Sequence, residues 1–176
     1  MSNSKPEIFI LDVDGVLTDG KFYYSADGKL LKVFGPDDHD ALKLLQPYIE
    51  IVFVTGDKRG FPISQARIVT DMGMRLELVS TTKRAEWIAE RWDITKVMYM
   101  GDGIFDHFVF KKVAYAIAPA NADPLAKQHA HFITQRSGGD RAVAEACKHV
   151  IERFFEKSVA LDSSPTAPHS NAEWGQ

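Results

Sequence analysis

The sequence predicts an α/β fold: a doubly wound, Rossmann-like parallel sheet with helices on both faces and a β-hairpin that protrudes after the first strand. Continuous apolar runs of strand length recur along the chain, which is typical of strands buried on both faces. Stretches with helical spacing separate these runs, and this alternation indicates a parallel sheet. A third observation predicts the hairpin, because aromatic and β-branched residues flank an Asp-Gly pair.

The elements follow in order along the chain. We expect buried strands at residues 8–11, 49–54, 96–100 and 113–117, and helices at residues 40–45, 62–72, 83–92, 106–111, 124–129 and about 140–157. The hairpin occupies about residues 20–34, with its turn at Asp27-Gly28. Because it directly follows the first strand, we expect it above the carboxyl edge of the sheet, where open α/β proteins bind ligands.

Length and composition are those of one domain with a hydrophobic core. The chain has 176 residues, of which 45% are hydrophobic and 26% charged, and a single domain takes about 100–200 residues. We expect this domain to cover residues 1–157 and a polar, proline-containing, disordered tail to cover residues 158–176. A formal net charge of −3 disfavours a nucleic-acid coat. With no apolar run long enough for a signal peptide or membrane span, we expect a cytoplasmic protein with no membrane partner.

Two carboxylates mark the end of the first strand, in the stretch Asp12-Val13-Asp14-Gly15. Beyond a strand end the chain can curl, so both carboxylates can address one point. Such a pair suits a metal site, or a nucleophile with its acid/base group. A calcium-binding EF-hand loop is excluded, because its sixth and twelfth positions require Gly and Glu, where this chain has Leu17 and Tyr23.

Residues suited to binding a metal or a phosphate also follow other predicted strands. Thr55-Gly56 follows the second buried strand, Asp102 and Asp106 follow the third, and Lys83 lies at a predicted helix start. Asp102 converging on Asp12 and Asp14 would give an oxygen-rich site suited to Mg²⁺. A hydroxyl, backbone N–H groups and an ammonium are donors for phosphate oxygens. The combination predicts phosphoryl transfer.

These motifs resemble those of the haloacid-dehalogenase superfamily of phosphatases. The chain is similar to the small capless branch that contains 3-deoxy-octulosonate 8-phosphate phosphatase and the nonulosonate 9-phosphate phosphatases. The likeness runs from about Ile8 to Phe155 and includes the hairpin, Thr55-Gly56, and Ser137-Gly138-Gly139 before the last helix. The stretch DVDGVLTDG, residues 12–20, is its most specific part.

The resemblance implies a role for each catalytic residue. Asp12 would attack phosphorus and form an aspartyl-phosphate. Asp14 would protonate the leaving oxygen and then deprotonate the attacking water. Thr55 and Lys83 would hold the transferring phosphoryl group, with the Gly56 N–H helping.

The resemblance also implies the metal ligands. Mg²⁺ would be bound by the carboxylates of Asp12 and Asp102 and by the backbone carbonyl of Asp14. Asp106 would contribute to phosphate binding indirectly, by orienting a metal-bound water or Lys83. The substrate would be a small phosphate ester, since the branch acts on phosphorylated sugar acids.

Four positions depart from the branch. Gly103 stands where a second aspartate is common, Asp57 replaces an arginine, residues 37–39 replace Arg-Asp-Gly, and Ala144 replaces an arginine near the start of the last helix. The first change removes an acidic group near the metal. The others weaken the case for a sugar-acid carboxylate as the ligand.

Two other functions stay open on the sequence alone. One is a catalytically weak binding or interaction protein on the same fold, suggested by Gly103 and the altered residues after the hairpin. The other is a phosphatase for nucleic-acid ends, which the net charge of −3 disfavours. Since the chain is too short to carry a cap domain, the resemblance implies a homotetramer in which the hairpin of a neighbouring subunit covers each site. Phe22, Tyr23 and Leu31 would then be partly buried between chains.

Overall fold

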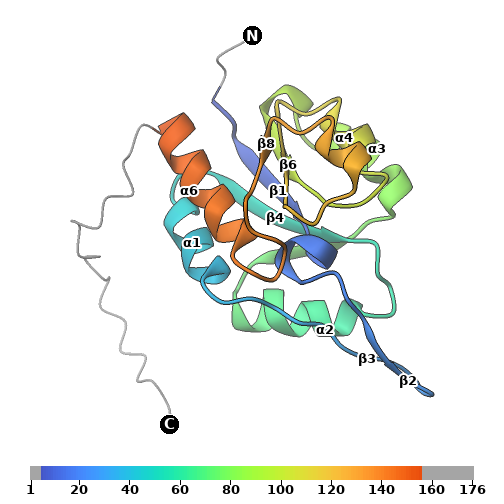
Figure 1. Ribbon diagram of the computed structural model, residues 1–176. Helices are drawn as coiled ribbons and strands as arrows, with labels where there is room; N and C mark the ends of the chain where they lie inside the picture. The colour runs from blue at the N-terminus through green and yellow to red at the C-terminus, as the bar shows by residue number, and fades with distance from the viewer. Residues whose placement is uncertain (1–4, 156–176) are drawn as a thin grey trace.

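A computed structural model describes residues 5–155, in which a six-stranded parallel sheet lies between two layers of helices (Figure 1). The strand order is β5-β4-β1-β6-β7-β8, and every pairing in this sheet is parallel. The strands are β1 (Ile8–Asp12), β4 (Glu50–Thr55), β5 (Arg75–Leu78), β6 (Val97–Met100), β7 (Tyr115–Ala118) and β8 (Phe132–Ile133). The predicted fold class is confirmed.

The helices are short, apart from the last. They are α1 (Asp38–Leu45), α2 (Phe61–Gln65), α3 (Arg84–Ala89), α4 (His107–Phe110), α5 (Pro124–Lys127) and α6 (Ala142–Phe155), together with the helical turns η1 (Val13–Leu17), η2 (Ala66–Asp71), η3 (Thr81–Lys83) and η4 (Ile94–Lys96). Among these helices none is long and apolar enough to cross a lipid bilayer.

Alternating side chains of the central strands build two hydrophobic cores. In β1, Phe9 and Leu11 belong to the core that contains α1 and α6, whereas Ile8 and Ile10 belong to the core that contains α3, α4 and α5. Successive side chains of a strand point to opposite faces, so a run that is apolar throughout requires cover on both sides. This double cover fixes β1 in the middle of the sheet, with its carboxyl end between those of β4 and β6.

The predicted hairpin forms a separate antiparallel pair, β2 (Tyr23–Ser25) and β3 (Gly28–Leu31), that extends away from the sheet (Figure 1). At the turn, Gly28 has a φ of 125°, a backbone conformation that residues with a side chain rarely adopt. The large apolar side chains of the hairpin are exposed: Phe22, Tyr23, Tyr24, Leu30, Leu31 and Val33.

Two strands escape the sequence pattern. β5 alternates charged and apolar residues, in the order Arg75-Leu76-Glu77-Leu78, because it is an edge strand and not buried on both faces. β8 is only two residues long. The last helix was expected at about residues 140–157 and is observed as α6 over Ala142–Phe155. The predicted tail, residues 158–176, lies outside the described residues.

Candidate active site

Three neighbouring strands deliver polar residues to one edge of the sheet. β1 ends at Asp12, β4 ends at Thr55, and β6 is followed by Gly101 and Asp102. Because β1 pairs with both β4 and β6, these residues meet at the carboxyl edge. A cavity of about 550 Å³ opens there, and Asp12, Asp14, Gly56, Arg84 and Asp102 are among the residues that line it.

The turn after β1 lets the carboxylate of Asp102 approach that of Asp12. The Val13 N–H donates to Asp12 Oδ1 at 2.8 Å, and the chain then bends at Gly15, whose φ is 88°. A Cβ at Gly15 would lie 1.9 Å from Asp102 Oδ2. Only glycine, which tolerates this backbone conformation and leaves this space, allows Asp102 to lie against the turn.

Arg84 connects two of the acidic residues in a fully buried network. Its Nη1 lies 2.7 Å from Asp12 Oδ2 and 3.2 Å from Asp106 Oδ1, and it donates to the Tyr99 hydroxyl at 2.6 Å. The Tyr99 O–H donates to Asp106 Oδ1 at 2.7 Å. Arg84 Nε and Nη2 are buried and have no hydrogen-bond partner among the described residues. Arg84 lines the cavity, and the N–H donors of these two nitrogens are the part of its guanidinium that no acceptor in the described part of the chain uses.

The structure does not bring Lys83 to the site. Lys83 is exposed and does not line the cavity, whereas Arg84, the next residue, is completely buried and does. Successive residues of a helical turn point about 100° apart, so only one of two adjacent cations can face the cavity. The start of α3 at Arg84 decides which one. This placement differs from the expectation for Lys83, because Arg84 is the residue of the two that lines the cavity.

Three carboxylates lie close enough to share one cation. Asp12, Asp102 and Asp106 each offer an oxygen, and these oxygens lie within 4.8 Å of one another. Burial and the negative charges of Asp12 and Asp106 raise the pKa of Asp102 to about 8. Burial also raises the pKa of Asp12 to about 6, against the lowering effect of Arg84. The negative charges of these three carboxylates are only partly balanced by nearby cations, and all their ligand atoms are oxygens. Such a group fits a hard divalent cation such as Mg²⁺.

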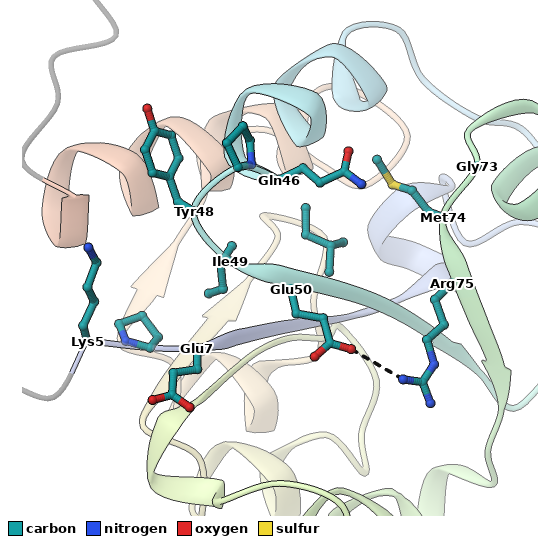
Figure 2. Close-up of a pocket in the computed structure, with 12 residues that line it drawn as sticks. Lys5, Glu7, Gln46, Tyr48, Ile49, Glu50, Gly73, Met74 and Arg75 are labelled. Atoms are coloured by element: carbon teal, nitrogen blue, oxygen red, sulfur yellow. Dashed lines mark hydrogen bonds and ion pairs between the residues drawn. The ribbon is translucent and has the colours of Figure 1, made fainter.

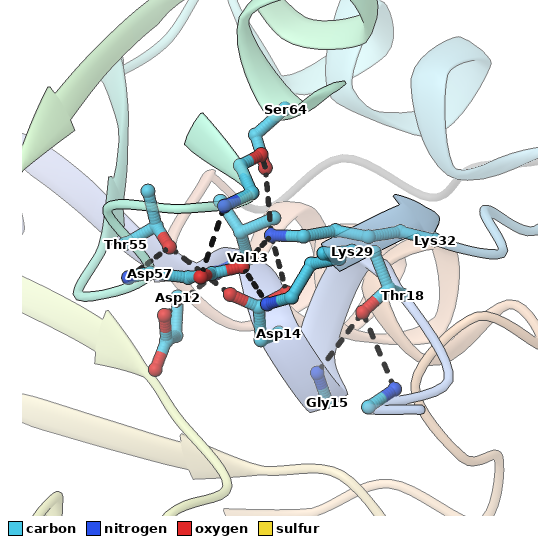
Figure 3. Close-up of polar contacts among 12 residues, drawn as sticks. Asp12, Val13, Asp14, Gly15, Thr18, Lys29, Lys32, Thr55, Asp57 and Ser64 are labelled. Atoms are coloured by element: carbon cyan, nitrogen blue, oxygen red, sulfur yellow. Dashed lines mark hydrogen bonds and ion pairs between the residues drawn. The ribbon is translucent and has the colours of Figure 1, made fainter. Parts of the chain in front are cut away.

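Asp14 is not part of this trio, and its carboxylate lies among Lys29, Lys32 and Thr55 (Figure 3). The Thr55 hydroxyl donates to Asp14 Oδ2 at 3.0 Å and accepts from the Asp57 N–H at 3.1 Å. The Lys32 Nζ lies 2.7 Å from Asp14 Oδ1. The Asp14 carboxylate thus contacts side chains from β4 and from the end of the hairpin, while it still borders the cavity.

Asp57, which replaces an arginine of the resembled branch, is paired with two lysines. Lys29 forms an ion pair with its Oδ2, and the Lys32 Nζ lies 3.0 Å from the same oxygen. Burial alone would raise the pKa of Asp57, but hydrogen bonds from Lys29, Lys32 and the Gly60 N–H lower it to about 2. The negative charge of Asp57 is therefore balanced by the positive charges of Lys29 and Lys32 at this wall of the cavity.

Comparisons with known proteins agree with this geometry. Residues 84–147 match the family model of haloacid dehalogenase-like hydrolases. The 3-deoxy-D-manno-octulosonate 8-phosphate phosphatase of Escherichia coli strain K12 is 33% identical over 152 residues, which cover 80% of this chain and 76% of that enzyme. The chain belongs to the haloacid dehalogenase-like hydrolases.

Solved structures place the hydrolase among phosphatases of the same fold. The 3-deoxy-D-manno-octulosonate 8-phosphate phosphatase of Yersinia pestis matches with a TM-score of 0.71 and 29% identity, covering 85% of this chain and 82% of that one. The cobalt-bound form of deoxy-D-mannose-octulosonate 8-phosphate phosphatase from Haemophilus influenzae matches with a TM-score of 0.79 and 25% identity, covering 93% and 96%. This chain is a phosphatase of the same family.

Some residues at the site of this hydrolase were not predicted from the sequence. The Asn121 amide donates to the Gly15 carbonyl at 2.9 Å and accepts from the Gly138 N–H at 2.7 Å, so it ties the turn after β1 to the loop before α6. Arg84 and Lys32 were not singled out either. A basic residue next to a predicted catalytic lysine is a signal that points to Arg84. Lys32 lies beyond the hairpin turn, and only the fold brings it to Asp14.

A larger cavity of the phosphatase, about 770 Å³, lies at the opposite end of the strands (Figure 2). Its lining mixes opposite charges, and Arg75 forms an ion pair with Glu50 across it at 3.4 Å. None of the predicted site residues lines this cavity. Asp12, Asp14, Gly56 and Asp102 line the cavity at the carboxyl edge instead.

Proposed function

We propose that this phosphatase hydrolyses the phosphate monoester of a small sugar or sugar acid, with Mg²⁺ bound at the carboxyl edge of the sheet. The observation that carries the proposal is the convergence of Asp12, Asp102 and Asp106 beside the buried guanidinium of Arg84. An acidic trio next to a cation at one cavity holds a divalent metal and a dianionic phosphoryl group together. The octulosonate phosphatases named above support the substrate class.

Two successive displacements at phosphorus account for the reaction. In the first, a carboxylate oxygen of Asp12 forms a bond to phosphorus while the bond from phosphorus to the ester oxygen breaks, and Asp14 gives its proton to that oxygen. In the second, a water oxygen attacks phosphorus, the bond to Asp12 breaks, and Asp14 takes the water's proton. Inorganic phosphate and the alcohol are released, and both aspartates return to their starting states.

The residues around Asp12 serve charge compensation. A bound Mg²⁺ would be held by Asp12, Asp102 and the backbone carbonyl of Asp14, and it would supply positive charge against the incoming dianion. Asp106 positions Arg84 through the contact of its Oδ1 with Nη1. Arg84, with two unpartnered N–H groups, takes over the phosphoryl contacts expected of Lys83. The N–H of Gly56, which lines the cavity, adds a further donor, while the Thr55 hydroxyl donates to Asp14.

The departures from the branch bear on the alcohol part of the substrate. Ala144, where the branch has an arginine, is buried and does not line the site cavity. Lys58 does line it, next to the neutralised Asp57. The cavity therefore offers cationic and hydroxyl groups to the leaving alcohol, with Phe22 and Leu78 as apolar walls. A polyhydroxylated alcohol fits such a lining.

We also propose that the working form is a cytoplasmic homotetramer. The hairpin exposes a cluster of large apolar side chains, with Tyr24 56% and Leu30 57% exposed. An apolar cluster on a protruding element is typical of a contact with another chain. A neighbour's hairpin over the cavity would exclude water and contact the leaving alcohol, a task that a cap domain performs elsewhere.

The decisive assay uses the purified chain with p-nitrophenyl phosphate, with and without Mg²⁺. Turnover in Mg²⁺ is expected, and Asp12→Asn is expected to lose it while keeping the circular-dichroism spectrum of the wild type. A screen of hexose phosphates and of eight- and nine-carbon sugar-acid phosphates then identifies the substrate class. Equal activity in Asp12→Asn, or no turnover of any ester in the screen, contradicts the proposed function.

A further inference from the structure

A lysine without solvent contact lies behind the candidate acid/base group. The side chain of Lys32, just after β3, is 0% exposed. Its Nζ lies 2.7 Å from Asp14 Oδ1, 3.0 Å from Asp57 Oδ2 and 3.0 Å from Ser64 Oγ (Figure 3). We propose that Lys32 is a positioning residue that holds the Asp14 carboxyl group toward the leaving oxygen, an inference that rests on the proposed function.

The Lys32 ammonium donates a hydrogen bond to Ser64 and forms ion pairs with Asp14 and Asp57, so it is enclosed by protein groups. An ammonium group has three N–H donors, and three acceptors surround this one: two carboxylate oxygens and a hydroxyl. The residue also does not line the site cavity, although Asp14 and Asp57 do. A cation so enclosed acts on the reaction through Asp14. This separates Lys32 from Arg84, which borders the cavity and keeps free N–H groups.

Lys32 and Thr55 hold the two oxygens of Asp14 from different elements. Lys32 contacts Oδ1 from the hairpin, and the Thr55 hydroxyl donates to Oδ2 from the end of β4 at 3.0 Å. Rotation of the carboxyl group would break the hydrogen bond from Thr55 and lengthen the ion pair with Lys32, so the two contacts together favour one orientation. Each carboxylate oxygen has more than one acceptor position, so Asp14 can still exchange a proton with the ester oxygen or with water. Such orientation accounts for much of the efficiency of a catalytic group.

Asp57 and Gly60 keep Lys32 in place. Asp57 Oδ1 accepts from the Gly60 N–H at 3.0 Å, which points its Oδ2 at the lysine. A Cβ at Gly60 would lie 2.1 Å from Asp57 Oδ2 and 2.7 Å from Lys32 Cε. The φ of Gly60 is −93°, an ordinary value for any residue. A glycine is therefore needed at position 60 for space, because Asp57 and Lys32 lie where a Cβ would be. The backbone conformation itself does not require glycine.

The test exploits the leaving group. The p-nitrophenolate ion leaves phosphorus readily without a proton, whereas phenolate is more basic and gains more from one. We expect Lys32→Met to lower kcat/KM for phenyl phosphate on the order of tenfold more than for p-nitrophenyl phosphate, since a positioned acid contributes roughly 10²–10⁴-fold where a proton is needed. Gly60→Ala, which displaces the same two side chains, should change the ratio in the same direction.

The matched control is Lys29→Met. Lys29 pairs with the same Asp57 oxygen and lies over the Phe22 ring at 3.4 Å, and its ion pair is with Asp57 and not with Asp14. This variant should keep the wild-type ratio of the two esters. Lys32→Met losing activity on both esters equally, or keeping the wild-type ratio, overturns the inference. If Lys32→Met does not fold, the ratio in Gly60→Ala decides. A wild-type chain that hydrolyses neither ester contradicts the proposed function instead.

Discussion

Arg84 Nη1 lies 2.7 Å from Asp12 Oδ2, so the first residue of α3 directly contacts the residue that ends β1. Burial by itself would lower the pKa of Arg84, but the negative charges around it, that of Asp12 first, raise it well above its usual value. Arg84 is thus a permanent cation at the point where a phosphoryl group would meet Asp12. The exposed Lys83 beside it has no such position.

This contact predicts opposite results for two adjacent substitutions. Arg84→Met should lower kcat for p-nitrophenyl phosphate by about 10²-fold or more, as removal of a donor to transition-state charge does. Lys83→Met should stay within about twofold of the wild type, because exposed substitutions are nearly neutral. Steady-state kinetics on both variants, with circular dichroism as the folding control, checks this. A larger loss of kcat in Lys83→Met than in Arg84→Met would indicate that Lys83 contacts the phosphoryl group.

Metal affinity should respond to Gly103. Its Cβ would lie 3.4 Å from Asp106 Oδ2, an ordinary contact, so the backbone accepts a side chain there. Gly103→Asp adds a carboxylate next to the acidic trio and should lower the Mg²⁺ concentration for half-maximal activity by about tenfold, at the lower end of what groups around metal ligands contribute. Asp102→Asn should raise it, and chelation should abolish activity. Unchanged Mg²⁺ titrations in both variants would argue against a metal at these carboxylates.

Stability should depend on pH through Asp38, which is 1% exposed. Its Oδ1 accepts from the Ala144 N–H at 2.9 Å, and its buried Oδ2 has no hydrogen-bond partner among the described residues. Burial raises the pKa of Asp38 from 3.8 to about 6. The folded state therefore holds this proton more tightly than the unfolded state, and the associated stability is lost as pH rises from about 4 to about 6.

Asp38→Asn removes that loss, because the amide is neutral at every pH. Its free energy of unfolding relative to the wild type should be higher at about pH 7.5 than at about pH 4.5 by roughly 2 kcal/mol. A shift of about two units is worth about 3 kcal/mol in full, and roughly a third of that is already lost at about pH 4.5. Urea unfolding at the two pH values measures it. Asp40→Asn, exposed in the same helical turn, is the control and should show no such difference. A pH-independent effect of Asp38→Asn would contradict this assignment.

Association should depend on the hairpin. Light scattering at micromolar concentration should give the mass of four 19.7 kDa chains. Leu30→Lys combined with Tyr24→Lys should reduce this mass and lower kcat/KM for sugar phosphates, since the exposed apolar cluster is replaced by charge. Leu44→Lys, at a comparably exposed leucine of α1, should leave the mass unchanged. A wild-type chain that is a monodisperse monomer rules out the proposed tetramer.

The strands of the central sheet were predictable because their burial on both faces leaves continuous apolar runs, as at residues 8–11. The edge strand β5 was not, since half of its side chains are charged. Asp12, Thr55 and Asp102 were predictable because parallel strands end at one edge. The choice of Arg84 over Lys83 depends on the helical register at the start of α3, and the burial of Lys32 depends on how the hairpin meets α2. Neither leaves a periodic signal in the sequence.

The stereochemical course at phosphorus reports whether Asp12 forms a covalent aspartyl-phosphate. The substrate is a thiophosphate ester made chiral with oxygen isotopes, hydrolysed in isotopically labelled water. Each in-line displacement inverts the configuration, so attack by Asp12 followed by attack of water predicts overall retention. Overall inversion would show that water attacks the ester directly, and it would contradict the role assigned to Asp12.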